Sequence, residues 1–124
     1  MNGIIIISKN DKQIKEIYEQ WKYIGKNMSS SLEDLRMSLP EGNIYIHLWE
    51  EGYQFYDDEL KKINYKEKHF YLVDYSNSDT LIFFLKNTIF SEDCYFDNDN
   101  GMIVSLKQLR KNINSFVYFS TDTL

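Results

Sequence analysis

The segment Gly3-Ile4-Ile5-Ile6-Ile7-Ser8 carries the strongest structural signal in the chain, because four consecutive β-branched residues leave no polar position. A strand exposed on one face alternates apolar and polar residues, whereas a strand covered on both faces is apolar throughout. Residues 3–8 are therefore predicted to form a strand buried inside a sheet.

An amphipathic helix is predicted directly after this strand, over residues 11–25. Its apolar positions recur at three- and four-residue steps, namely Ile14, Ile17, Tyr18, Trp21 and Ile24. Gly25 stands where such a helix would end. Trp21 is in phase with the apolar stripe, so we expect it to be a core residue.

The middle of the chain is predicted to hold a second helix and a hairpin. Ser30 with Glu33, or Ser31 with Asp34, has the spacing of a helix start, and the apolar residues that follow are Leu32, Leu35, Met37 and Leu39. Residues 43–49 alternate, with Ile44, Ile46 and Leu48 on one face and Tyr45, His47 and Trp49 on the other. Tyr53–Tyr56 is expected to be the hairpin partner of this strand.

The last third of the chain alternates again between strands and helices. We expect a strand at His69–Tyr75, a helix near 79–88, a hairpin joining Tyr95-Phe96 to Met102–Ser105, a helix at 106–112 and a strand at 116–119. The predicted fold class is α+β: a single domain over residues 1–124, in which about four helices pack on a mixed, mainly antiparallel sheet.

Composition bounds the possible partners and the compartment. The net charge of −5 argues against nucleic acid or an anionic membrane as a direct partner. Cys94 is the only cysteine, so the chain has no internal disulfide, and its start lacks the features of a signal peptide. We therefore expect a cytoplasmic protein; the sequence leaves its oligomeric state open.

An acidic and aromatic block occupies the interval between Arg36 and Lys61, which contains no lysine or arginine. Its acids are Glu41, Glu50, Glu51, Asp57, Asp58 and Glu59, and its aromatic residues are Tyr45, Trp49, Tyr53, Phe55 and Tyr56. Solvated acidic tails are poor in such rings, which gain free energy only when they are covered. A basic protein partner would satisfy both the charges and the rings.

The partner-binding surface is therefore predicted to consist of Trp49, Glu50, Glu51, Tyr53, Tyr56, Asp57, Asp58 and Glu59, with Asp97 and Asp99 as a further acidic contact. The competing interpretation is that these rings face the core and the acids only keep the outside polar. Alternation along Tyr53–Tyr56 places part of the set in the core under either interpretation.

Patterns for catalysis, metal binding or cofactor binding are weak. The Asp97–Gly101 segment resembles a calcium loop, but a register with Gly101 at position six puts Phe96 at position one and Lys107 at position twelve. The acids Glu92 and Asp93 beside Cys94 would raise its thiol pKa. There is no glycine-rich phosphate loop and no hydrolase or zinc-protease motif. We expect no metal, no cofactor and no enzymatic activity.

In size, in acidity, in the Glu50–Glu59 block and in the Tyr95–Val104 hairpin, the chain resembles the small immunity proteins of bacterial contact-dependent inhibition and polymorphic toxin systems. The resemblance implies a stoichiometric inhibitor of one cognate toxin domain, often a nuclease with a basic active site. Two alternatives remain: a small cytosolic enzyme that uses Cys94, His47 or His69, and an acidic mimic of nucleic acid.

Overall fold

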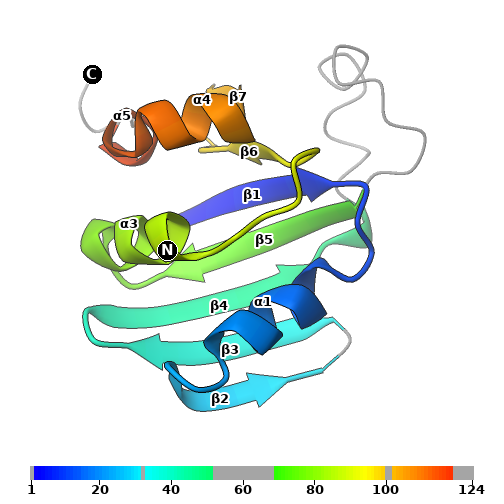
Figure 1. Ribbon diagram of the computed structural model, residues 1–124, viewed down its shortest axis with the longest axis vertical. Helices are drawn as coiled ribbons and strands as arrows, with labels where there is room; N and C mark the ends of the chain where they lie inside the picture. Colours follow the sequence, from blue (N-terminus) through cyan, green and yellow to red (C-terminus); the bar gives the residue numbers. More distant parts are fainter. Residues whose placement is uncertain (1, 32, 52–68, 100–101, 119–124) are drawn as a thin grey trace.

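The computed structural model describes residues 2–31, 33–51, 69–99 and 102–118. These residues form a seven-stranded sheet in the order β2-β3-β4-β5-β1-β6-β7, and every neighbouring pair is antiparallel (Figure 1). The strands are β1 Asn2–Ser8, β2 Lys26–Ser30, β3 Asp34–Leu39, β4 Gly42–Leu48, β5 His69–Tyr75, β6 Tyr95–Asp97 and β7 Ile103–Ser105. The helices within the described ranges are α1 Gln13–Trp21, α3 Ser78–Asn87, α4 Leu106–Lys111 and α5 Ile113–Tyr118. The predicted α+β class is confirmed.

β1 lies inside the sheet, as its sequence predicts. It pairs with β5 along one edge and with β6 along the other. Each of the four isoleucines is at most 5% exposed, so both faces of the strand are covered. Because each side chain removes its full apolar area from water, this strand is a large contributor to the stability of the sheet.

The described helices all pack on one face of the sheet (Figure 1). The large core cluster joins Ile4 and Ile6 of β1 to buried residues of α1, α3, α4 and α5. Ile5 and Ile7 point to the opposite face, where they form a second, smaller cluster with Phe70. No residue of a described helix belongs to that smaller cluster.

The apolar stripe of α1 packs on the sheet, and Trp21 is buried as predicted. The Trp21 indole N–H donates to Thr88 Oγ1 at 2.9 Å, which ties α1 to the end of α3. The helix is shorter than the predicted range of 11–25. It ends at Trp21, whose carbonyl accepts from the amides of Ile24 and Gly25, and Ile24 is 63% exposed.

The prediction of a second helix is wrong, since Lys26–Ser30 and Asp34–Leu39 form the antiparallel strands β2 and β3 instead. Leu35, Met37 and Leu39 are buried while the residues between them are not, which is a period of two. The Ser31 hydroxyl accepts from the amides of Glu33 and Asp34, as a helix cap would, but here it closes a turn between strands.

The predicted strand at 116–119 is also wrong where the structure describes it, because Ile113–Tyr118 forms α5. Phe116 and Val117 are both buried in the main cluster, and helical spacing places Ile113 beside them. The predicted hairpin partner Tyr53–Tyr56 lies outside the described residues. On its two edges β4 pairs with β3 and β5.

Several other elements are confirmed. β5 spans His69–Tyr75 as predicted, and α3 begins after Asn77, whose side chain accepts from the Thr80 amide. β6 and β7 form the predicted hairpin, and α4 starts with a capping box at Ser105. None of the described helices has the length and apolar content that a bilayer span requires.

Candidate functional site

The face of the sheet opposite the described helices is the strongest candidate for a binding surface, and it is called the second face below. Cross-strand registers place on it Asp34 and Arg36 of β3, Tyr45 and His47 of β4, Phe70, Leu72 and Asp74 of β5, and Ile5 and Ile7 of β1. Trp49, just after β4, packs against the apolar cluster of this face. The predicted alternation of β4 is thus confirmed, with Ile44 and Ile46 turned towards the helices.

One end of the second face is apolar. Ile7 and Phe70 are directly opposite each other on β1 and β5, and both are at most 1% exposed. Trp49 lies at this end, half-buried, and its backbone N–H donates to the Phe70 carbonyl at 2.7 Å. Trp49, the aromatic residue that directly precedes Glu50 and Glu51, is therefore fixed to the sheet.

The other end of the second face is polar and ordered around Tyr45. The Tyr45 hydroxyl donates to Asp34 Oδ1 at 3.1 Å. The Arg36 guanidinium lies over the Tyr45 ring at 4.5 Å, and the His47 ring centroid is 5.1 Å from that of Tyr45. His47 Nδ1 is buried and has no hydrogen-bond partner among the described residues. These four residues, Asp34, Arg36, Tyr45 and His47, are called the Tyr45 corner below.

The charges of the second face are mainly negative. Apart from Lys26 in the edge strand β2, Arg36 is the only lysine or arginine in the described strands. Asp74 stands directly opposite both Tyr45 and Gly3, and a β-carbon at Gly3 would approach Asp74 Oδ1 to 3.2 Å. Gly3 therefore leaves space beside this carboxylate.

The structure brings together only part of the predicted partner-binding set. Trp49 borders the second face, and Glu50 and Glu51 follow it as exposed residues. The remaining residues of the block fall outside the described ranges and are Tyr53, Tyr56, Asp57, Asp58 and Glu59.

Asp97 and Asp99 lie away from Glu50 and Glu51. The registers place Asp97 of β6 level with His47 of β4, and the strands β5 and β1 lie between them. Asp97 is only 6% exposed, and its carboxylate accepts from the Asp99 amide at 2.8 Å. Desolvation, together with the negative charge of Asp97, raises the pKa of Asp99, which is exposed. The buried Asp97 carboxylate therefore stabilises the start of the turn that follows β6.

Cys94 directly precedes β6 and is fully buried in the main core cluster. Burial, together with the nearby charge of Asp93, raises its thiol pKa to about 11, and the thiol lies 3.4 Å from Gln13 Oε1 as a donor. A thiol in this state is protonated at neutral pH and is a poor nucleophile. Among the described residues, no three His, Cys, Asp or Glu side chains lie close enough to hold a metal ion together.

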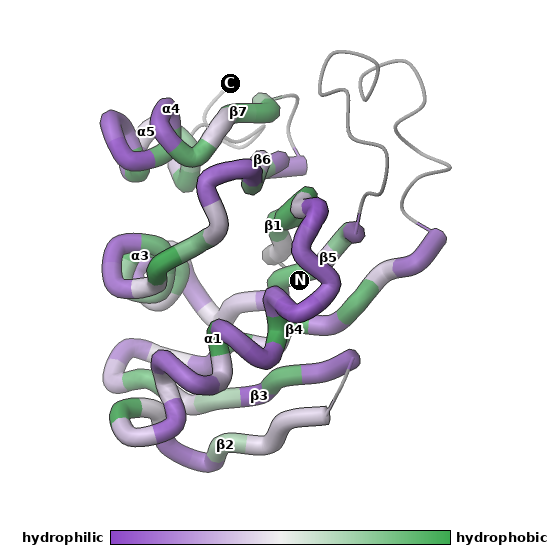
Figure 2. The backbone as a smooth tube through the Cα atoms, turned by 45° about the vertical axis from the view of Figure 1, so that its right-hand side comes forward, coloured by the Kyte–Doolittle hydropathy of each residue, from purple (hydrophilic) through white to green (hydrophobic). Residues whose placement is uncertain are grey.

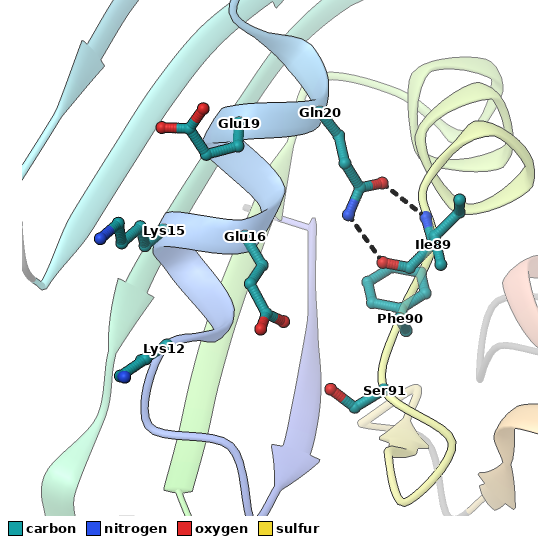
Figure 3. A pocket seen from close by; sticks show the side chains of 8 residues that line it. All are labelled: Lys12, Lys15, Glu16, Glu19, Gln20, Ile89, Phe90 and Ser91. Atoms are coloured by element: carbon teal, nitrogen blue, oxygen red, sulfur yellow. Dashed lines mark hydrogen bonds between the residues drawn. The ribbon is translucent and has the colours of Figure 1, made fainter.

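Two surface grooves flank α1 on the helical side. The first, of about 560 Å³, lies between α1 and the 89–91 segment, where the Gln20 side chain bonds both the amide and the carbonyl of Ile89 (Figure 3). The second, of about 520 Å³, lies between α1 and β2. Lys15 and Glu19 line both grooves, so neither groove selects one sign of charge.

The edge strand β2 is a poor docking site for another strand. Its residues are largely hydrophilic, unlike the apolar β1 (Figure 2). A register shift between Lys26 and Ser29 and a positive φ of 52° at Asn27 interrupt its pairing geometry. Lysines and bulges of this kind protect sheet edges against unwanted strand addition.

Comparisons of the chain with protein-family models, with curated proteins and with solved structures found no match. The Tyr45 corner is therefore identified by its geometry alone. Sequence reasoning missed Arg36 and Asp34 because it assigned them to a helix. The signal was the alternation of Asp34, Arg36 and Ser38 with buried Leu35 and Met37.

Proposed function

We propose that this protein is a stoichiometric inhibitor that binds one basic protein domain through the second face and the acidic residues next to it. In biological terms it would act as an immunity protein that neutralises a cognate toxin domain, such as a nuclease with a basic active site. Its own chain would supply charge and shape, while the catalytic groups would belong to the toxin.

One observation carries this proposal. Tyr45, His47 and Trp49 form a row along β4 on the face opposite the described helices, and the row leads directly to the exposed carboxylates Glu50 and Glu51. Tyrosine, tryptophan and arginine dominate the binding energy of protein interfaces, and complementary charge speeds the encounter of the partners. Arg36, at the Tyr45 corner, supplies the arginine of this set.

The chemistry of Cys94 also favours binding over catalysis. An enzyme that used this thiol would need access for its substrate and a lowered thiol pKa. Cys94 has neither, because it is fully buried and its pKa is raised. A single unpaired cysteine also fits the cytoplasm, where we place the protein.

The proposal is tested by charge reversal on matched surfaces. The double variant Glu50→Lys/Glu51→Lys changes the acidic end of the second face. The control Glu19→Lys/Glu41→Lys changes two exposed glutamates away from that end, because Glu19 is on α1 and Glu41 precedes β4, at the other end of this strand from Glu50. Each reversal adds two charges, so both double variants move from the wild-type −5 to −1. Association rates are measured with the protein that co-purifies with the wild-type chain, cloned and purified separately.

We expect the Glu50/Glu51 variant to associate about tenfold more slowly than the Glu19/Glu41 variant at low ionic strength, because steering depends on local charge. The difference should shrink at high salt, where exposed charges are screened. Equal rates for the two variants would refute the proposed surface. Failure of the wild-type chain to inhibit any activity of the co-purified protein would refute the inhibitor role.

A further inference from the structure

Arg36 is held in place before any partner binds. It lies directly opposite Tyr45 in the β3–β4 register, with its guanidinium 4.5 Å from the ring centroid. Tyr45 is itself held by its hydroxyl bond to Asp34 Oδ1. Stacking on an aromatic ring restricts a flexible arginine and reduces the conformational entropy that it loses on binding.

The N–H donors of Arg36 have no acceptor in the part of the chain that the structure describes. Among the described residues its guanidinium has no hydrogen-bond or ion-pair partner, and the side chain is exposed. The contact with the Tyr45 ring provides no hydrogen-bond acceptor, so the five N–H donors of the guanidinium can still match a carboxylate in a bidentate pair. A partner that covered these donors without offering an acceptor would bury an unpaired charge, which is costly.

We infer that Arg36, stacked on Tyr45, is the specificity anchor of the interface and pairs with a carboxylate on the partner protein. The inference rests on the proposed function and deepens it, because it describes the partner surface as basic with one acidic group opposite the Tyr45 corner. A uniformly basic surface would be repelled by Arg36, so this residue separates the cognate partner from other basic proteins.

A partner that is basic throughout and a partner with a carboxylate opposite Arg36 predict opposite results for one substitution. If the partner were basic throughout, Arg36→Glu would remove a repulsion, so association would be faster and the complex tighter. If a carboxylate faces Arg36, the same change places two negative charges together and leaves both unpaired. The complex should then dissociate faster.

The experiment measures dissociation of the purified co-purifying protein from the wild type and from three variants: Arg36→Glu, Arg36→Gln and Arg36→Lys. Because Arg36 is exposed, these variants are expected to fold, which circular dichroism and a denaturant titration would check. We expect dissociation to be about thirtyfold faster for Arg36→Gln, faster still for Arg36→Glu, and intermediate for Arg36→Lys, which keeps the charge but loses the planar fork.

Unchanged or slower dissociation of Arg36→Glu would overturn the inference. The proposed function would still stand in that case, provided that Glu50→Lys/Glu51→Lys slows association relative to its control. If the wild-type chain binds no protein at all, the proposed function fails and the inference fails with it. Loss of binding in Arg36→Glu that is rescued by a lysine substituted for one partner carboxylate would locate the pair directly.

Discussion

Raising the pH should destabilise the folded chain through the buried thiol of Cys94. Burial raises the pKa of this thiol from 9.0 to about 11, so the folded state holds its proton more tightly than the unfolded state. Where the folded state binds more protons, stability falls as the pH rises. The loss begins near the unfolded pKa of 9.0 and is complete above about 11.

The size of the effect follows from the shift in pKa. Two pKa units correspond to at most about 2.7 kcal/mol, and at pH 10.5, below the folded pKa, about 2 kcal/mol of this is lost. Burial also raises the pKa of Tyr71 to about 12, which adds to the loss in the same direction. A control is therefore needed that keeps Tyr71 and removes only the thiol.

Cys94→Ser is that control, since a serine hydroxyl can still donate to Gln13 Oε1 but does not titrate in this range. Urea unfolding at pH 7.5 and pH 10.5 gives the loss of stability for each protein. The wild type should lose about 2 kcal/mol more than Cys94→Ser. Equal losses, or a native thiolate absorbance that titrates below pH 9, would refute the account of Cys94 as a buried, inert thiol.

Three core and turn positions give further predictions, each read by denaturant unfolding. Trp21→Ala should cost about 3–5 kcal/mol because it empties a buried site, whereas Tyr23→Ala, at an 88% exposed position, should change stability by less than about 0.5 kcal/mol. Gly42→Ala should cost about 2 kcal/mol, since its β-carbon would lie 2.6 Å from a threonine hydroxyl. Asn98→Ala should cost about 2 kcal/mol by leaving a buried carbonyl unpaired, and exposed Asn87→Ala much less. Reversed orders within these pairs, or a neutral Gly42→Ala, would contradict the packing described above.

The sequence predicted those elements whose pattern had one interpretation. The isoleucine run gave β1, the three- and four-residue spacing gave α1, and Asn77 marked the start of α3. Residues 30–39 were misassigned because serine caps occur both before helices and in turns between strands. For short segments such as 113–118, burial in the tertiary core decides between helix and strand, and local sequence does not contain that information.

The candidate site was predicted in part. The alternation of β4 correctly placed Tyr45, His47 and Trp49 on one face, and the acidic block pointed to Glu50 and Glu51. The Tyr45 corner could not be predicted, because it depends on the register that sets Arg36 opposite Tyr45. Registers of this kind arise from the packing of strands that were not assigned as strands.

Site-specific photo-crosslinking tests the central claim most directly, since it asks which face of the protein touches the partner. A photoreactive phenylalanine replaces half-buried Leu72 on the second face or, as a matched control, half-buried Tyr18 on α1. The account predicts that the co-purified protein is crosslinked from position 72 and not from position 18. Crosslinking from position 18 alone, with the partner bound in both cases, would contradict it.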